Sequence, residues 1–112
     1  SEQHQFRVLQ AAIRRGHAAP AMRELMRWLD RINDARRPAR LDRFLERYGD
    51  ADTRALLRAL QQELDGSGRI ADGGALAKSL ARARERWLQQ VAQHHTGPLA
   101  LPPLNGTSTR ET

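Results

Sequence analysis

Apolar residues return at every third or fourth position along most of the chain, and this spacing constrains the fold more than any other feature. Leu25, Leu29 and Ile32 follow one another in this way, and Leu76 and Leu80 repeat the pattern later in the sequence. Residues with this spacing share one face of an α-helix, whereas a strand requires alternation with period two. No segment alternates in that way, and β-branched residues are scarce. The sequence therefore predicts an all-α protein.

Glycine and proline divide the first part of the pattern into two predicted helices. Gly16 suits the left-handed residue that follows a helix C-terminus. Pro20 then suits the first turn of a second helix, whose flank carries arginines at positions 23, 27 and 31. This helix is predicted to continue through the Asn33-Asp34 region. A connection at residues 35–38 follows, because Pro38 disfavours a helical conformation at the residue before it.

Three further helices are predicted after this connection. The first is short and ends at Gly49, and Asp50 is a suitable N-cap for the next. A loop covers residues 65–70, and Asp72 is predicted to cap the last helix, which runs to about His94 before Gly97-Pro98 ends it. Residues 1–95 thus form a compact bundle of about five helices, arranged as two helical hairpins and a long C-terminal helix. A faint similarity between residues 23–29 and 54–60 also leaves open a tetratricopeptide-like stacking.

The C-terminal tail divides into two predicted parts. Residues 96–105 contain three prolines and three leucines, and we expect this segment to be extended and docked across a groove between helices. Docking of the same segment on another protein is the alternative. Residues 106–112 are polar and are predicted to be a disordered tail.

The charge is strongly basic, with 19 Lys and Arg residues against 13 Asp and Glu residues. Every basic residue except Lys78 is an arginine, which reflects either the composition of the genome or a surface for phosphate, anionic lipid or acidic protein. We expect Trp28 at the edge of the second helix, where it either closes the core or anchors an interface. Trp87, in contrast, lies on the apolar face of the last predicted helix and is predicted to be in the core. The possible partner surface consists of Trp28, Arg36, Arg37, Arg40, Arg43 and Arg47.

Sequence motifs for catalysis or for metal and cofactor binding are absent. His94 and His95 are adjacent and do not share a helical face, and the chain has no cysteine. We therefore expect no catalytic residue, no metal and no cofactor. Nucleic-acid binding is supported by charge alone, because the sequence offers neither a clear recognition helix nor surface aromatic residues. A basic helical module that binds nucleic acid or an anionic membrane surface remains the alternative to a protein-interaction domain.

The order of several features resembles a known family. A helix containing Leu9 is followed by Gly16 and by a helix with Leu25 and Trp28, and the chain later reaches Pro102-Pro103-Leu104-Asn105. This order resembles the C-terminal cytoplasmic domain of BatD-type proteins, which are encoded in bacterial aerotolerance (Bat) operons. The resemblance covers nearly the whole chain. It departs from the family at Gly106, where another proline is expected, and in the loop at residues 66–74, which lacks the expected Tyr and Trp.

The resemblance implies a topology and a set of partners. In BatD-type proteins a secretion signal, a periplasmic region and one transmembrane helix precede the helical domain. Ser1 agrees with a piece of such a longer protein, and no stretch of the chain is apolar enough to span a membrane itself. The basic charge fits the cytoplasmic side of the inner membrane. The implied function is a non-enzymatic adaptor, whose expected partners are von Willebrand A-type Bat proteins and a MoxR-type AAA+ ATPase.

Overall fold

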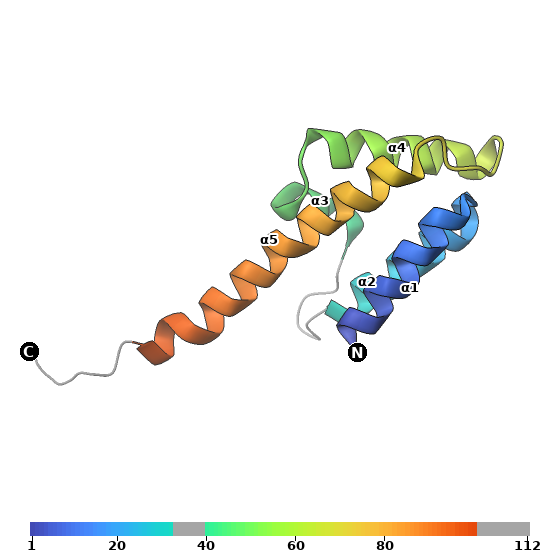
Figure 1. Ribbon diagram of the computed structural model, residues 1–112. Helices are drawn as coiled ribbons and strands as arrows, with labels where there is room; N and C mark the ends of the chain where they lie inside the picture. The colour runs from blue at the N-terminus through green and yellow to red at the C-terminus, as the bar shows by residue number, and fades with distance from the viewer. Residues whose placement is uncertain (33–39, 101–112) are drawn as a thin grey trace, which may run out of the picture.

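Five helices form the computed structural model, which describes the backbone of residues 1–32 and 40–100 and the side chains as far as Gln93. Apart from one isolated bridge, these residues contain no extended backbone pairing. The predicted all-α class is therefore confirmed. The helices are α1 (Glu2–Arg15), α2 (Ala18–Ile32), α3 (Leu41–Tyr48), α4 (Ala51–Asp65) and α5 (Gly73–Ala100) (Figure 1).

A tight turn joins α1 to α2 and makes them a hairpin. Gly16 has a φ of 86° in the left-handed region, and its N–H donates to the carbonyl of Ile13 at 3.0 Å. The predicted helix end at Gly16 is thus confirmed. Ala18 and Ala21 are fully buried where α2 meets its neighbours. Because alanine is small, the helix axes can approach closely at these positions.

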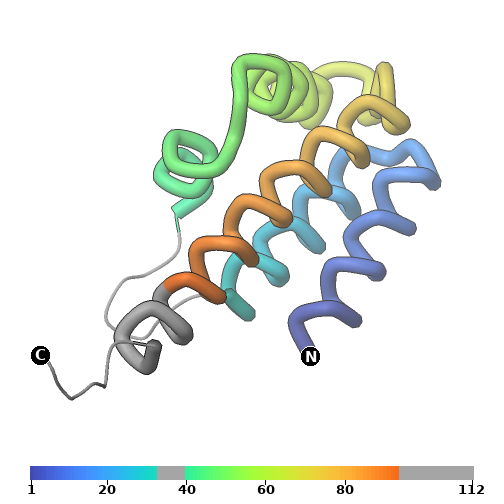
Figure 2. The backbone as a smooth tube through the Cα atoms, turned by 60° about the vertical axis from the view of Figure 1, so that its left-hand side comes forward, coloured from blue at the N-terminus to red at the C-terminus, as the bar shows by residue number. Residues whose placement is uncertain are grey.

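The long helix α5 contacts most of the other helices. It packs against α1 on one side and against α3 and α4 on the other, while α2 packs against α1 and α4. Figure 2 shows α5 between the α1–α2 hairpin and the α3–α4 segment. The apolar faces of all five helices therefore meet in one core.

Aspartate caps begin the last two helices, as the sequence predicts. Asp50 accepts a hydrogen bond from the backbone N–H of Thr53 at 2.9 Å and forms a capping box with that residue. Asp72 accepts from the N–H of Ala75 at 3.0 Å at the start of α5. These two bonds satisfy N–H groups that lack a partner within their helices.

The C-terminal end of α5 differs from the prediction. The helix continues to Ala100, beyond the expected end at His94, so residues 96–100 are helical rather than extended. Pro98 therefore lies within the last turns of the helix, where proline holds φ near the helical value although it forgoes one backbone hydrogen bond and crowds the preceding turn. Residues 101–112, which include the rest of the predicted docked segment and the predicted disordered tail, lie outside the described residues.

A pair of backbone hydrogen bonds joins the two loops at one end of the molecule. The N–H of Ala18 donates to the carbonyl of Gly68 at 2.8 Å, and the N–H of Ile70 donates to the carbonyl of Gly16 at 2.9 Å. These bonds form an isolated antiparallel bridge between His17 and Arg69. The α1–α2 turn is thereby attached to the loop between α4 and α5.

An aromatic cluster occupies the opposite end of the core. The Trp28 ring lies 5.1 Å from Phe6, 5.2 Å from Phe44 and 6.2 Å from Trp87, measured between ring centroids. Tyr48 extends the cluster through its contact with Phe44 at 5.2 Å. All four of these contacts are tilted or edge-on, an arrangement that aromatic rings favour. All five aromatic residues of the chain therefore belong to a single cluster.

Candidate functional site

Three of the predicted surface arginines lie together, two on α3 and one at its N-cap. Arg40, Arg43 and Arg47 are exposed, and the last two are one helical turn apart. The Nε of Arg40 lies 3.3 Å from Oδ1 of Asp42, and the guanidinium of Arg47 lies 5.8 Å from the centroid of the Tyr48 ring. Arg36 and Arg37 lie outside the described residues.

Trp28 does not belong to this surface: of its two predicted roles, closing the core agrees with the structure, while an exposed interface anchor is wrong. Its side chain is completely buried, whereas Trp87 is only partly buried and packs at the edge of the core. The apolar face of α2 is rotated relative to the predicted one, so Met26 is 39% exposed while Ala21 is buried. The face expected from the large residues Leu25, Leu29 and Ile32 did not include the small alanine at the helix contact. Trp28 is therefore a core residue and cannot anchor a partner.

A hydrogen-bonded ion pair covers the buried tryptophan. The Trp28 Nε1–H donates to Oε2 of Glu2 at 2.7 Å, and Arg84 donates to both carboxylate oxygens of Glu2 at 2.7 and 2.8 Å. The hydrogen bond from Arg84 lowers the pKa of Glu2, against the opposing effect of burial. The same bond raises the pKa of Arg84, whose guanidinium also lies 5.0 Å from the Phe6 ring centroid. Glu2, Trp28 and Arg84 thus fulfil one another's hydrogen-bonding needs, and we assign these three residues a role in stability.

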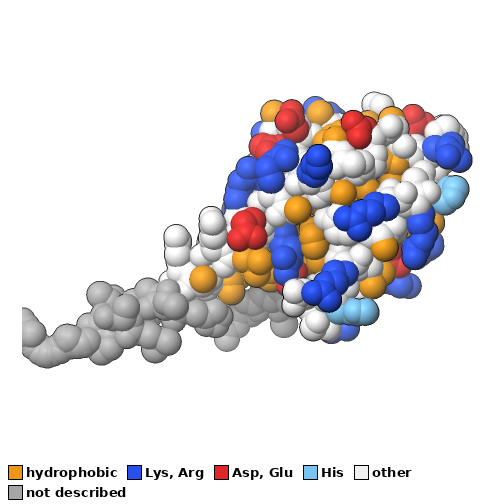
Figure 3. Space-filling model, in the orientation of Figure 1, with side chains coloured by type: hydrophobic (Ala, Val, Ile, Leu, Met, Phe, Trp, Pro, Cys, Tyr) orange, Lys and Arg blue, Asp and Glu red, His pale blue; other side chains and the backbone are white. Residues whose placement is uncertain are grey.

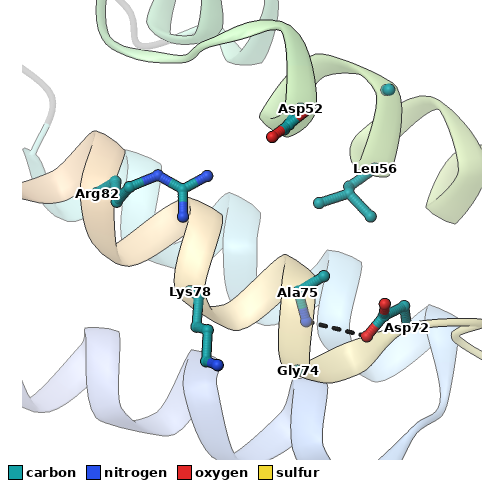
Figure 4. Close-up of a pocket in the computed structure, with 8 residues that line it drawn as sticks. Asp52, Leu56, Asp72, Gly74, Ala75, Lys78 and Arg82 are labelled. Atoms are coloured by element: carbon teal, nitrogen blue, oxygen red, sulfur yellow. Dashed lines mark hydrogen bonds between the residues drawn. The ribbon is translucent and has the colours of Figure 1, made fainter.

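A groove of about 630 Å³ lies between α4 and α5 (Figure 4). Small residues on both sides, including Ala55 and Ala75, leave space that no side chain fills. Leu56 projects into this space from α4, and the Asp72 cap lies at the start of α5. We call this feature the α4–α5 groove; it is lined by Asp52, Ala55, Leu56, Asp72, Gly74, Ala75, Lys78 and Arg82.

Charged side chains of both signs surround this apolar space. Lys78 and Arg82 are one turn apart on α5, and Asp52 lies across the groove from Arg82 (Figure 4). Lys78 is exposed, and the described residues provide no carboxylate within ion-pair distance of it. The groove therefore offers apolar contact and nearby carboxylates to an incoming molecule, and the unpaired ammonium group of Lys78 lies at its α5 edge, directed away from Leu56 (Figure 4).

Asp50 fixes the geometry where the groove meets α3. Its Oδ2 lies 3.5 Å from Nη2 of Arg82 and 3.4 Å from Nη2 of Arg86, and Arg86 also donates to the carbonyl of Tyr48 at 2.7 Å. The backbone and side-chain hydrogen bonds from Thr53 hold the pKa of Asp50 well below its ordinary value. This carboxylate is thus ionised at neutral pH and restrains Arg82.

A buried polar contact joins α4 to α5 beneath the groove. The hydroxyl groups of Thr53 and Ser79 are hydrogen-bonded to each other, and both residues are fully buried. Arg82 donates to the Ser79 hydroxyl at 3.3 Å. Because buried hydroxyls are costly without partners, this pair favours one relative position of the two helices. The walls of the groove are therefore fixed before anything binds.

Comparison with known proteins does not assign this chain to a family. No family model matches the chain, and neither a curated protein nor a solved structure matches it. Within the described part of the chain, no helix has the length and apolar character needed to cross a membrane. The described side chains also include no group of three or more that could hold a metal ion.

The residues of the α4–α5 groove were absent from the predicted partner surface. Two sequence features could have indicated them. Lys78 is the single lysine in an arginine-rich chain, and Gly74-Ala75 provides small residues at the start of a helix. Neither feature reveals that Leu56 lies opposite, because that proximity depends on the packing of α4 against α5.

Proposed function

We propose that this chain is a non-enzymatic protein-interaction domain and that the α4–α5 groove binds a segment of its partner. The observation that carries this proposal is a groove with an apolar surface, an unpaired Lys78 and carboxylates at its edge. Peptide segments bind in such grooves by inserting apolar side chains and by pairing charges at the rim. The fixed walls reduce the ordering that binding would require.

The resemblance to BatD-type proteins supports a particular setting for this function. In that setting the domain belongs to a membrane-anchored aerotolerance protein and lies on the cytoplasmic side of the bacterial inner membrane. It acts as an adaptor for a von Willebrand A-type Bat protein or a MoxR-type AAA+ ATPase. The net charge of +6 agrees with the cytoplasmic side under the positive-inside rule.

An NMR titration tests the proposal directly. Each of these two proteins is added to the ¹⁵N-labelled chain, and we expect shifts of the amides that line the α4–α5 groove. Ala55→Arg fills the groove and is expected to weaken binding by about tenfold or more. The matched control is Ala81→Arg, because Ala81 is also exposed on a helix but lies outside the groove.

Three results would contradict the proposal. One is the absence of shifts with both proteins in stoichiometric excess. Another is unchanged affinity in Ala55→Arg, and the third is an equal loss of affinity in the Ala81→Arg control. Circular dichroism of both variants verifies that the helices are retained. Lys78 supplies the only lysine side chain, so an amine-reactive cross-link mapped to Lys78, and not to the α-amino group of Ser1, gives an independent readout of the groove in the complex.

The exposed arginines favour a second candidate function. The face in Figure 3 carries more basic than acidic side chains, and Arg43 has no carboxylate partner among the described residues. A basic module would bind an oligonucleotide or anionic vesicles, and its affinity would fall steeply with salt. Such binding, if unaffected by Ala55→Arg, would support this function over the adaptor.

A further inference from the structure

A second groove, of about 240 Å³, lies between α3 and α4 on the flank of α4 that faces away from the α4–α5 groove. Figure 2 shows α3 and the start of α4 connected by a bend, which brings the two helices to one region of the molecule. We call this feature the α3–α4 groove. It is lined by Leu41, Asp42, Leu45, Arg54, Leu57, Arg58 and Gln61.

Three leucines form the floor of the α3–α4 groove. Leu41 and Leu45 are one turn apart on α3, and Leu57 faces them from α4. Leu57 and Leu45 are buried, with 1% and 8% of their surfaces exposed, so the half-buried Leu41 supplies most of the accessible apolar surface of this floor. This floor is apolar and recessed, so it suits an aliphatic side chain better than a hydrated phosphate group.

The rim of the same groove is positively charged. Arg58 is exposed and has no carboxylate partner among the described residues. Arg54 donates to two backbone carbonyls, those of Leu45 at 3.3 Å and Gly49 at 3.4 Å, and these leave its charge without a carboxylate. Asp42, the only acidic residue of the lining, is already paired with Arg40. The groove therefore presents two cationic side chains, one turn apart, beside an apolar floor.

We propose that the α3–α4 groove binds an acidic segment of another protein that inserts a leucine-like side chain. The apolar side chain lies on Leu41, Leu45 and Leu57, and carboxylates of the segment pair with Arg54 and Arg58. Charge complementarity selects this partner, because the rim has two uncompensated guanidinium groups and its carboxylate is already occupied. This inference is independent of the α4–α5 groove, which lies on the other flank of α4 and has a rim of mixed charge.

Fluorescence anisotropy with the full chain and two synthetic peptides tests this inference. One labelled peptide contains glutamates and two leucines one helical turn apart, and the matched peptide replaces the leucines with alanines. We expect the alanine peptide to bind about tenfold more weakly. Arg58→Glu is expected to weaken binding of the leucine peptide by a similar factor. Arg23→Glu, at an exposed position of α2 outside both grooves, makes the same charge change and is expected to leave this binding unchanged.

Each alternative outcome overturns the inference. Equal affinity for the two peptides would mean that charge alone attracts them, as for any polyanion. Equal losses in Arg58→Glu and Arg23→Glu would mean that the peptide responds to net charge rather than to this groove. Failure of the leucine peptide to bind would also reject the site. Arg58 is exposed, so the variant is expected to fold, and circular dichroism checks this.

Discussion

The two ends of the helix assembly are held together by different kinds of interaction. At one end, aromatic side chains surround Trp28, and Glu2 joins α1 to α2 and α5 through hydrogen bonds to Trp28 and Arg84. At the other end, two backbone hydrogen bonds link the Gly16 turn to the loop containing Gly68. We refer to these regions as the aromatic end and the bridge end.

The sequence indicates the tertiary contacts of the aromatic end more clearly than those of the bridge end. Aromatic residues at helical spacing indicate a buried region, which the sequence predicts for Trp87 but not for Trp28. A backbone bridge uses groups that every residue has, and only the glycines with positive φ leave a trace in the sequence. Substitutions should therefore affect the two ends by different amounts.

The largest expected effect comes from Trp28→Ala at the aromatic end. Removal of this fully buried side chain leaves a cavity among Phe6, Phe44 and Trp87, and we expect a loss of about 4 kcal/mol in the free energy of unfolding. Urea denaturation followed by circular dichroism measures it. Trp87→Ala removes a partly buried side chain and should cost less. Equal losses in the two variants would contradict the central position of Trp28; if Trp28→Ala does not fold, Trp28→Phe serves the same comparison.

An intermediate effect is expected for Glu2→Gln. The variant loses charge-assisted hydrogen bonds to Arg84, and we expect a loss of about 2 kcal/mol at pH 7. Because the pKa of Glu2 is lowered by folding, the ionised carboxylate stabilises the native state. This contribution is present above the unfolded-state pKa of 4.5 and is lost as the pH falls through the lower native-state pKa. Urea denaturation at several pH values should show a shallower acid dependence in Glu2→Gln, and identical pH profiles would reject this role.

The smallest effect is expected at the bridge end, for Gly68→Ala. Gly68 has a φ of 76°, and a Cβ at this position would meet no atom within 4 Å, so the cost of about 1 kcal/mol comes from backbone conformation alone. Gly74→Ala is the matched control. It lies in the first turn of α5, where the nearest atom is 3.8 Å away, and alanine should be neutral or slightly stabilising there. If both variants lost equal stability in thermal unfolding, strain at Gly68 would not be the cause.

Local features of the fold were predictable from sequence because they depend on neighbouring residues. The stop at Gly16 and the caps at Asp50 and Asp72 are examples, and the structure confirms all three. The exposure of Trp28 was not predictable, because the direction of the α2 apolar face depends on how closely Ala18 and Ala21 allow other helices to approach. The spacing of apolar residues shows roughly which side of a helix is buried, and the packing of neighbouring helices decides which residues on that side lose contact with solvent.

The candidate sites were less predictable than the helices. Arg40, Arg43 and Arg47 are exposed as expected, but neither groove was apparent from the sequence. Each groove combines residues from two helices, such as Leu41 with Leu57, and no local pattern records that proximity. A list of charged residues therefore locates the solvent-facing surface without locating the apolar recess beside it.

The position of the two tryptophans has a consequence for experiments on unfolding. Trp28 and Trp87 are the only tryptophans in the chain and lie 6.2 Å apart, so intrinsic fluorescence reports on a single neighbourhood of the protein. Opening that begins where the loops meet would leave the emission spectrum unchanged. Hydrogen exchange at the amides of Ala18 and Ile70 would detect it, since both amides donate across the bridge. An optical melting curve by itself would thus overstate how uniformly this small domain unfolds.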